Sequence, residues 1–156
     1  SMITRVGLQD AEYMPAPIKF EAGTQRVSQA VAFAAAVRYL QHLGMENVEA
    51  WEHELGARLV EGVQEIEGVR LLGPTDPTKR AGLVALAIEG VHPHDVGQLL
   101  DTQGIAVRVG HHCAQPLHRC AGVTASTRAS TYIYNTTEDV DAFLKALAEV
   151  RPYFGL

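Results

Sequence analysis

The segment VRLLGPTDPTKRAGLVALAI, residues 69–88, carries the clearest structural signal in the sequence. Its two apolar runs, Val69–Leu72 and Leu83–Ile88, have the length and composition of β-strands. The stretch between them, GPTDPTKR, is rich in the glycine, proline and aspartate that favour turns. The segment therefore predicts two strands that lie close together in the chain and are joined by an irregular connection.

Apolar residues at helical spacing surround this pair of strands. Upstream, the spacing predicts an unusually apolar helix over 24–43, of a kind that normally packs on both sides. A second helix over 47–66 has Asn47 as its candidate N-cap. The remaining expectations are irregular structure over 3–23, a helix over 93–103, a strand over 105–109, a loop over 110–124, a strand over 126–134, and a final helix from Thr136 or Thr137 through Val150.

The order of these elements is helix, helix, strand, strand, helix, strand, strand, helix. This order predicts an α+β fold, a two-layer sandwich in which a mostly antiparallel sheet is covered by helices. A chain of 156 residues is long enough to bury a core without cross-links.

Composition narrows the function classes. Hydrophobic residues make up 47% and charged residues 20%, as in a soluble globular protein. The net charge of −5 and the lack of a basic run argue against a nucleic-acid partner. No apolar run approaches the roughly 20 residues of a membrane span. The mixed polar residues 1–10 predict no signal peptide, so we expect a cytoplasmic protein with two free thiols, Cys113 and Cys120.

The stretch RVGHHCAQPLH, residues 108–118, is the best candidate for chemistry. It lies where a predicted strand ends and a loop begins, a common place for reactive groups on a rigid scaffold. Positive neighbours favour the reactive thiolate form of a cysteine. The neighbours of Cys113 that can carry positive charge are Arg108, His111, His112, His118 and Arg119.

Two other interpretations of this stretch remain open from the residues alone. A lone cysteine is often a small buried hydrophobe rather than a nucleophile. A zinc site is also conceivable, although the spacing matches no CxxC pair or HExxH helix. Its candidate ligands would be His111, His112, Cys113, His118 and Cys120.

Arg128 is a second candidate, because it stands among small residues in the predicted strand STRAS, residues 126–130. An arginine in such a place could bind a carboxylate through two parallel hydrogen bonds. The alternative is an ordinary arginine on the outer face of the sheet.

Several spaced motifs together resemble the group II, suf-type cysteine desulfurases, which are pyridoxal-phosphate enzymes of the class V aminotransferase family. The motifs occur in the family's order and extend over nearly the whole chain. They are FEAGT at 20–24, the run GIAVR at 104–108 into RVGHHCAQPLH, RAS at 128–130 and YNT at 134–136.

The resemblance implies a mechanism and a role for each matching residue. A lysine holds pyridoxal 5'-phosphate, which acts as electron sink while L-cysteine gives up its sulfur. Cys113 matches the nucleophile that becomes a persulfide as alanine is released, and Arg128 matches the arginine that binds the substrate carboxylate. Arg108 matches an arginine near the substrate. Gly23 and Thr24 match residues that reach the cofactor phosphate of the neighbouring subunit, which implies a homodimer.

The family's cofactor lysine follows Ser-His upstream of FEAGT, and none of Lys19, Lys79 or Lys145 matches it. We therefore interpret residues 1–2 as a cloning scar, 3–44 as the end of the large cofactor domain with a connecting helix, and 45–156 as the C-terminal small domain. The fragment alone is expected to lack cofactor and activity. The full-length transferase is expected to pass sulfur to an acceptor or scaffold protein of iron-sulfur cluster assembly.

Two rival functions stay open at this point. A selenocysteine lyase would use the same fold and loop. A non-catalytic module that relays sulfur or binds a partner would not need Cys113 at all.

Overall fold

The computed structural model describes residues 2–156, so Ser1, half of the predicted cloning scar, lies outside the described residues. The chain divides into two compact units, residues 1–44 and residues 45–156. In the described residues no helix is both long and apolar enough to span a membrane.

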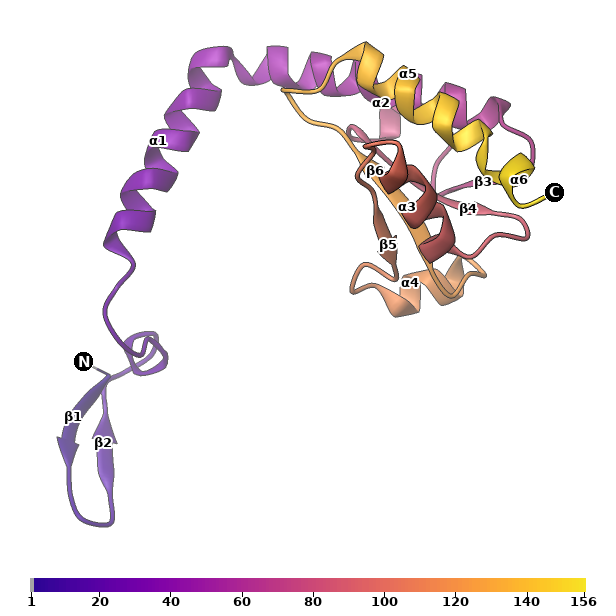
Figure 1. Ribbon diagram of the computed structural model, residues 1–156. Helices are drawn as coiled ribbons and strands as arrows, with labels where there is room; N and C mark the ends of the chain where they lie inside the picture. The colour runs from indigo at the N-terminus through magenta and orange to yellow at the C-terminus, as the bar shows by residue number, and fades with distance from the viewer. Residues whose placement is uncertain (1) are drawn as a thin grey trace. The chain divides into compact units, whose positions relative to one another are not determined.

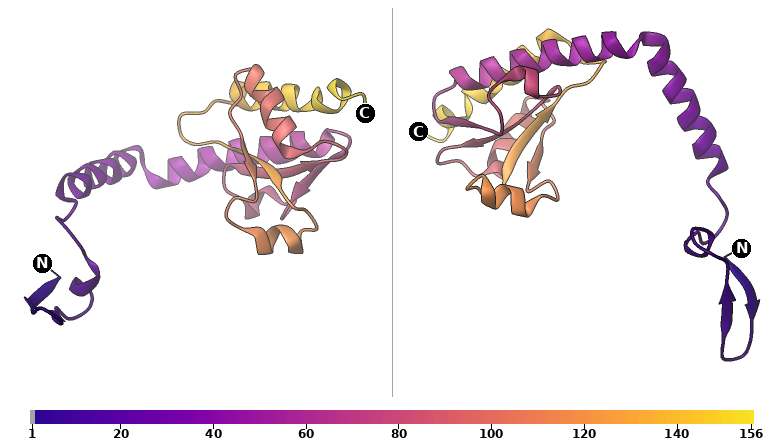
Figure 2. Two further views of the ribbon diagram at one scale, coloured as in Figure 1. Left: turned by 60° about the horizontal axis from the view of Figure 1, so that its bottom comes forward. Right: turned by 180° about the vertical axis from the view of Figure 1, so that it is seen from behind.

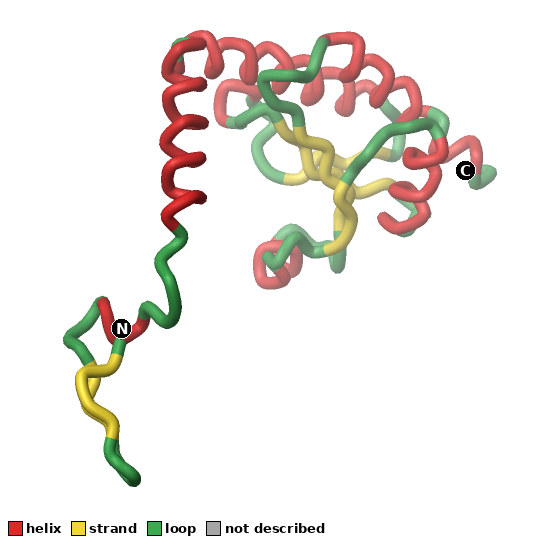
Figure 3. Tube along the Cα trace, turned by 60° about the vertical axis from the view of Figure 1, so that its left-hand side comes forward, coloured by secondary structure: helices red, strands yellow, loops and turns green. Residues whose placement is uncertain are grey.

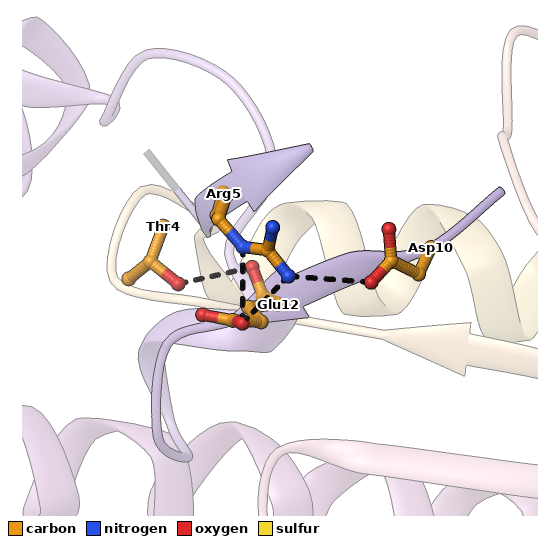
Figure 4. Close-up of polar contacts among 4 residues, drawn as sticks. All are labelled: Thr4, Arg5, Asp10 and Glu12. Carbon is orange, nitrogen blue, oxygen red and sulfur yellow. Dashed lines mark hydrogen bonds and ion pairs between the residues drawn. The ribbon is translucent and has the colours of Figure 1, made fainter. Parts of the chain in front are cut away.

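The first unit contains a β-hairpin that the sequence did not lead us to expect. Strands β1 (Ile3–Val6) and β2 (Ala11–Tyr13) pair antiparallel, and the Gly7 N–H donates to the carbonyl of Asp10 across the turn. Arg5 on β1 lies between two carboxylates, with its Nη2 atom 3.0 Å from Glu12 Oε1 and 3.3 Å from Asp10 Oδ2 (Figure 4). The prediction of irregular structure over 3–23 was therefore wrong for these strands.

Two helical elements follow the hairpin in the first unit. A short 3₁₀ turn, η1 (Ile18–Phe20), is followed by α1 (Val27–Leu43), which begins three residues later than predicted and ends at Gly44 with φ of 86°. No residue of α1 is buried, and the side chains of Val31 and Phe33 are 63% and 72% exposed. The expectation that this apolar helix packs on both sides is therefore not met within the described chain.

The second unit is the predicted two-layer α+β sandwich (Figures 1 and 2). Its four strands form one antiparallel sheet in the order β3-β4-β6-β5. Figure 3 shows these strands as one yellow layer beside the red helices. The elements are α2 (Met45–Glu65), β3 (Val69–Leu72), η2 (Pro77–Lys79), β4 (Leu83–Ile88), α3 (Pro93–Thr102), β5 (Arg108–Gly110), α4 (Gln115–Cys120), β6 (Ser126–Ser130), α5 (Thr137–Ala148) and α6 (Val150–Tyr153).

One apolar core lies between the sheet and helices α2, α3 and α5. Alternate residues of β4 point to this core, because successive side chains of a strand point to opposite faces. Residues at the centre of the core have almost no exposed surface: Leu55 and Leu59 of α2, Val84 and Leu86 of β4, Leu100 of α3, and Leu147 of α5. The other face of the sheet is left for the candidate site.

Strands β3 and β4 have the predicted bounds, whereas β5 and β6 do not. β6 ends at Ser130 rather than Tyr134, because the Tyr132 N–H donates to the side chain of Asn135 and the backbone turns. β5 begins at Arg108 rather than Ile105, since its pairing with β6 starts with Arg108 opposite Arg128. At α2, Asn47 is not an N-cap, because the helix already begins at Met45.

Candidate functional site

Cys113 lies at the tip of a tight loop directly after β5. Three residues of the loop have positive φ: Gly110 at 117°, His112 at 51° and Cys113 at 59°. Two consecutive non-glycine residues in this region are uncommon and mark a constrained backbone. The Ala114 N–H donates to the His111 carbonyl at 2.8 Å and closes the turn. The thiol of Cys113 is exposed and free.

Helix α4 fixes the far side of this loop. Pro116 stands in its first turn, where a missing N–H costs nothing. At the other end of the helix, Arg70 of β3 donates from Nη2 to the Ala121 carbonyl at 3.1 Å. The loop is thus held between a strand on one side and an anchored helix on the other.

Two arginines share the face of the sheet that is turned away from the core. Arg108 of β5 lies directly opposite Arg128 of β6, and Gly110 lies opposite Ser126 in the same ladder. Arg108 is exposed and Arg128 is half-buried. The Nε atom of Arg128 is buried and makes no hydrogen bond within the part of the chain that the structure describes. Two guanidinium groups so placed are suited to bind an anion such as a carboxylate.

A cluster of three polar side chains lies beside the arginines. Ser126 Oγ is 3.0 Å from His112 Nε2 and 2.9 Å from His118 Nε2, while His118 Nδ1 is 3.0 Å from the Ala114 carbonyl. The centroids of the two imidazole rings are 5.6 Å apart. Ser126 has no exposed surface and His118 only 7%, so the cluster is largely closed to water.

The electrostatic surroundings of His112 disfavour its charged form. Burial lowers the pKa of His112 below its ordinary value, and the positive charges of Arg128 and Arg108 lower it further. A contribution from the backbone of Ser126 acts in the opposite direction but is a smaller effect. We therefore treat His112 as a neutral imidazole at neutral pH, next to the exposed thiol in sequence.

The structure places Arg108 and Arg128 opposite each other and Cys113 on the loop that directly follows β5, and the sequence singles out all three residues. Sequence reasoning treated His112 and His118 only as basic neighbours or zinc ligands and gave Ser126 no role. Within residues 2–156, no group of three or more histidine, cysteine or acidic side chains is placed to hold a metal ion. The zinc alternative thus finds no ligand set among the described residues.

Gly23 and Thr24 belong to the first unit, in the bend between η1 and α1. Gly23 has φ of 84°, a conformation that favours glycine, and both residues are exposed. The N-cap residue of α1, Arg26, makes no side-chain capping bond, and the N-terminal end of a helix is electrostatically suited to a phosphate. These features fit residues that contact a cofactor phosphate, but no lysine in the sequence matches the one that would hold the cofactor covalently.

Comparison with known proteins shows which family the chain belongs to. The family model described as aminotransferase class-V matches residues 1–143, so the chain belongs to the class V aminotransferase family. Its relatives within that family include probable cysteine desulfurases. The chain is 49% identical over 155 residues to the "Probable cysteine desulfurase 2" of Mycobacterium leprae, covering 99% of this chain and 37% of the relative.

Two solved structures agree with this assignment. The apo cysteine desulfurase from Thermococcus onnurineus NA1 has a TM-score of 0.83 and 39% identity, and the match covers 99% of this chain and 38% of that one. The cysteine desulfurase CsdA from Escherichia coli has a TM-score of 0.82 and 33% identity, covering 97% and 37% respectively. The chain therefore spans little more than a third of the length of these relatives, and its fold is that of their corresponding part.

Proposed function

We propose that this chain is the small-domain part of a pyridoxal-phosphate-dependent cysteine desulfurase in which Cys113 accepts sulfur from L-cysteine. The observation that carries the proposal is the position of Cys113, an exposed free thiol on a constrained loop directly after the strand that holds Arg108. The likeness to cysteine desulfurases over nearly the whole chain supports the same assignment.

Each residue of the site has a distinct part in this reaction. The guanidinium of Arg128 binds the substrate carboxylate, and Arg108 adds positive charge on the same face. The thiolate of Cys113 attacks the sulfur of L-cysteine, so that a sulfur–sulfur bond forms and the carbon–sulfur bond breaks. The electron pair of the broken bond stays with the carbon, which takes a proton and leaves as alanine. Cys113 is left as a persulfide.

The bound cofactor would supply an electron sink that weakens the carbon–sulfur bond of the substrate. Gly23 and Thr24 are the residues of this chain that we propose contact its phosphate, in a site shared between the two subunits of a homodimer. The persulfide sulfur would pass to an acceptor protein of iron-sulfur cluster assembly. Both cysteines are free thiols, which fits a reducing, cytoplasmic compartment.

The decisive experiment uses the full-length protein that contains this chain, loaded with cofactor. We expect Cys113→Ala to abolish alanine release from L-cysteine and to remove a persulfide mass shift from the peptide spanning the loop. Cys120→Ala is the matched control, because Cys120 is also an exposed free thiol, at the end of α4. Undiminished alanine release by Cys113→Ala would refute the proposal. The 156-residue chain by itself is expected to release no alanine.

A further inference from the structure

The hydrogen bonds around Ser126 determine where the protons of the two histidines lie. The Ala114 carbonyl can only accept, so His118 must carry its proton on Nδ1 to make the 3.0 Å bond. When the His118 ring is neutral, its Nε2 has a bare lone pair, and this atom lies 2.9 Å from Ser126 Oγ. That lone pair must accept the one hydroxyl proton of Ser126.

The same reasoning extends to His112. Since the Ser126 proton is already donated to His118, its oxygen can only accept from His112, whose Nε2 lies 3.0 Å away. His112 therefore carries its proton on Nε2, and its Nδ1 is a bare acceptor. This Nδ1 atom is buried and has no hydrogen-bond partner within the described residues. Buried polar atoms without a partner are rare, and such an atom calls for an explanation.

A complementary donor lies on the same face of the sheet. The Nε–H of Arg128 is also buried and unpartnered among residues 2–156, and a guanidinium N–H can only donate. Arg128 stands two residues after Ser126 on β6, so the two side chains point to the same face. Among nearby charges, Arg128 has the largest influence on His112.

We propose that His112 positions Arg128, its bare Nδ1 accepting the Nε–H of the guanidinium in solution. His118 and Ser126 serve to hold His112 in the one tautomer that can accept. With Nε engaged in this way, the two terminal nitrogens of Arg128 are left to bind a carboxylate together. That last step rests on the proposed function, whereas the hydrogen bond itself does not.

The hydrogen bond can be tested by nuclear magnetic resonance on this 156-residue chain, labelled with ¹⁵N and without any substitution. Long-range ¹H–¹⁵N spectra should show His118 protonated on Nδ1 and His112 protonated on Nε2. A scalar coupling should connect Nδ1 of His112 with Nε of Arg128. Finding the proton of His112 on Nδ1, or finding no coupling, would overturn the inference.

Variants then separate positioning from mere structural support. His112→Ala should speed the solvent exchange of the Arg128 Nε–H, whereas His111→Ala, which changes the exposed neighbour, should leave it unchanged. His112→Asn should restore slow exchange, because its side-chain oxygen lies as many bonds from Cα as Nδ1 does. Equal exchange in the Ala and Asn variants would count against His112 as the acceptor.

In the full-length enzyme the inference predicts that KM and kcat change by different amounts. His112→Ala should raise KM for L-cysteine roughly tenfold while kcat changes less than twofold, and His112→Asn should recover most of the loss. An equal fall in kcat would contradict a positioning role. The two proposals fail separately, because persulfide formation on Cys113 tests the function, and the coupling between His112 and Arg128 tests this inference.

Discussion

Arg108 and Arg128 lie directly opposite each other in the β5–β6 ladder, so two guanidinium groups share one face of the sheet. Like charges at directly opposite positions destabilise a sheet by roughly 0.2–1 kcal/mol. Neither arginine forms an ion pair with a carboxylate among the described residues. A pairing that costs stability and has no internal counterion is typical of a site that binds an anion.

The first prediction follows from this repulsion. Arg108→Gln should make the chain slightly more stable, by a few tenths of a kcal/mol, and the gain should shrink as sodium chloride screens the charges. Urea unfolding at low and high salt measures both effects. Arg119→Gln, an exposed arginine of α4, is the control and should give no salt-dependent gain. A loss of stability in Arg108→Gln at low salt would contradict the prediction.

The second prediction concerns the charge that Arg128 exerts on His112. Burial is the largest cause of the lowered pKa of His112, and Arg128 is the next. Removing that charge in Arg128→Gln should raise the pKa of His112 partway toward its ordinary value of about 6.5. A pH titration of the imidazole signals measures the change. An unaltered pKa would show that the two groups do not interact.

The lowered pKa of His112 also makes the stability of the chain depend on pH. The folded pKa of His112 is lower than its unfolded value, so the unfolded chain binds the proton more readily. The stability that His112 contributes is therefore fully present above the unfolded pKa of about 6.5 and is lost as the pH falls through the folded pKa. In Arg128→Gln this loss should still begin near the unfolded pKa of about 6.5, but it should be complete at a higher pH and be smaller in total.

The third prediction tests the start of α5. Thr136 accepts from the Asp139 N–H at 3.3 Å, and Asp139 accepts from the Thr136 N–H at 3.0 Å, which is a capping box. Thr136→Ala should lower the free energy of unfolding by about 1 kcal/mol. Thr137→Ala is the matched control, since Thr137 is the first residue of the helix proper. Equal losses in the two variants would argue against the cap.

Sequence alone predicted the parts of the fold that depend on local patterns. Strands β3 and β4 have the expected bounds, because an apolar run between turn residues defines a strand locally. The end of β6 depends on a turn closed by the side chain of Asn135, and the start of β5 depends on where its pairing with β6 begins, neither of which the apolar pattern shows. The hairpin over 3–13 was missed although Gly7 and Asp10 are turn residues, because its strands are short and mostly exposed.

For the candidate site too, the sequence revealed the residues of local motifs but not the contacts that depend on the fold. Cys113 and Arg128 entered through motifs of contiguous residues, which a single sequence displays. The contact of Ser126 with His112 spans 14 residues and its contact with His118 spans 8. Both depend on a loop whose positive φ at His112 redirects the side chain, and the residue types alone do not indicate such a conformation.

The fourth prediction concerns the ion pair that joins α2 to α5. Arg58 donates from Nε to Asp141 Oδ1 at 2.6 Å and from Nη2 to Asp141 Oδ2 at 2.7 Å. The hydrogen bond from Arg58 is the largest cause that lowers the pKa of Asp141 below its ordinary value. Because the folded pKa is lowered, the stability that Asp141 contributes is present above the unfolded pKa, about 3.9, and is lost as the pH falls through the folded pKa.

Asp141→Asn should therefore be less stable than the unsubstituted chain at pH 7, with the two converging as the pH falls below about 4. Urea unfolding at a series of pH values measures the difference. In an Arg58→Met background the same substitution should matter much less, because the partner that lowers the pKa is gone. Both side chains are about half exposed, 47% for Arg58 and 50% for Asp141, so solvent screening keeps the effect modest. A difference that persists unchanged into acid, or that survives the loss of Arg58, would assign the effect of Asp141 to something other than this ion pair.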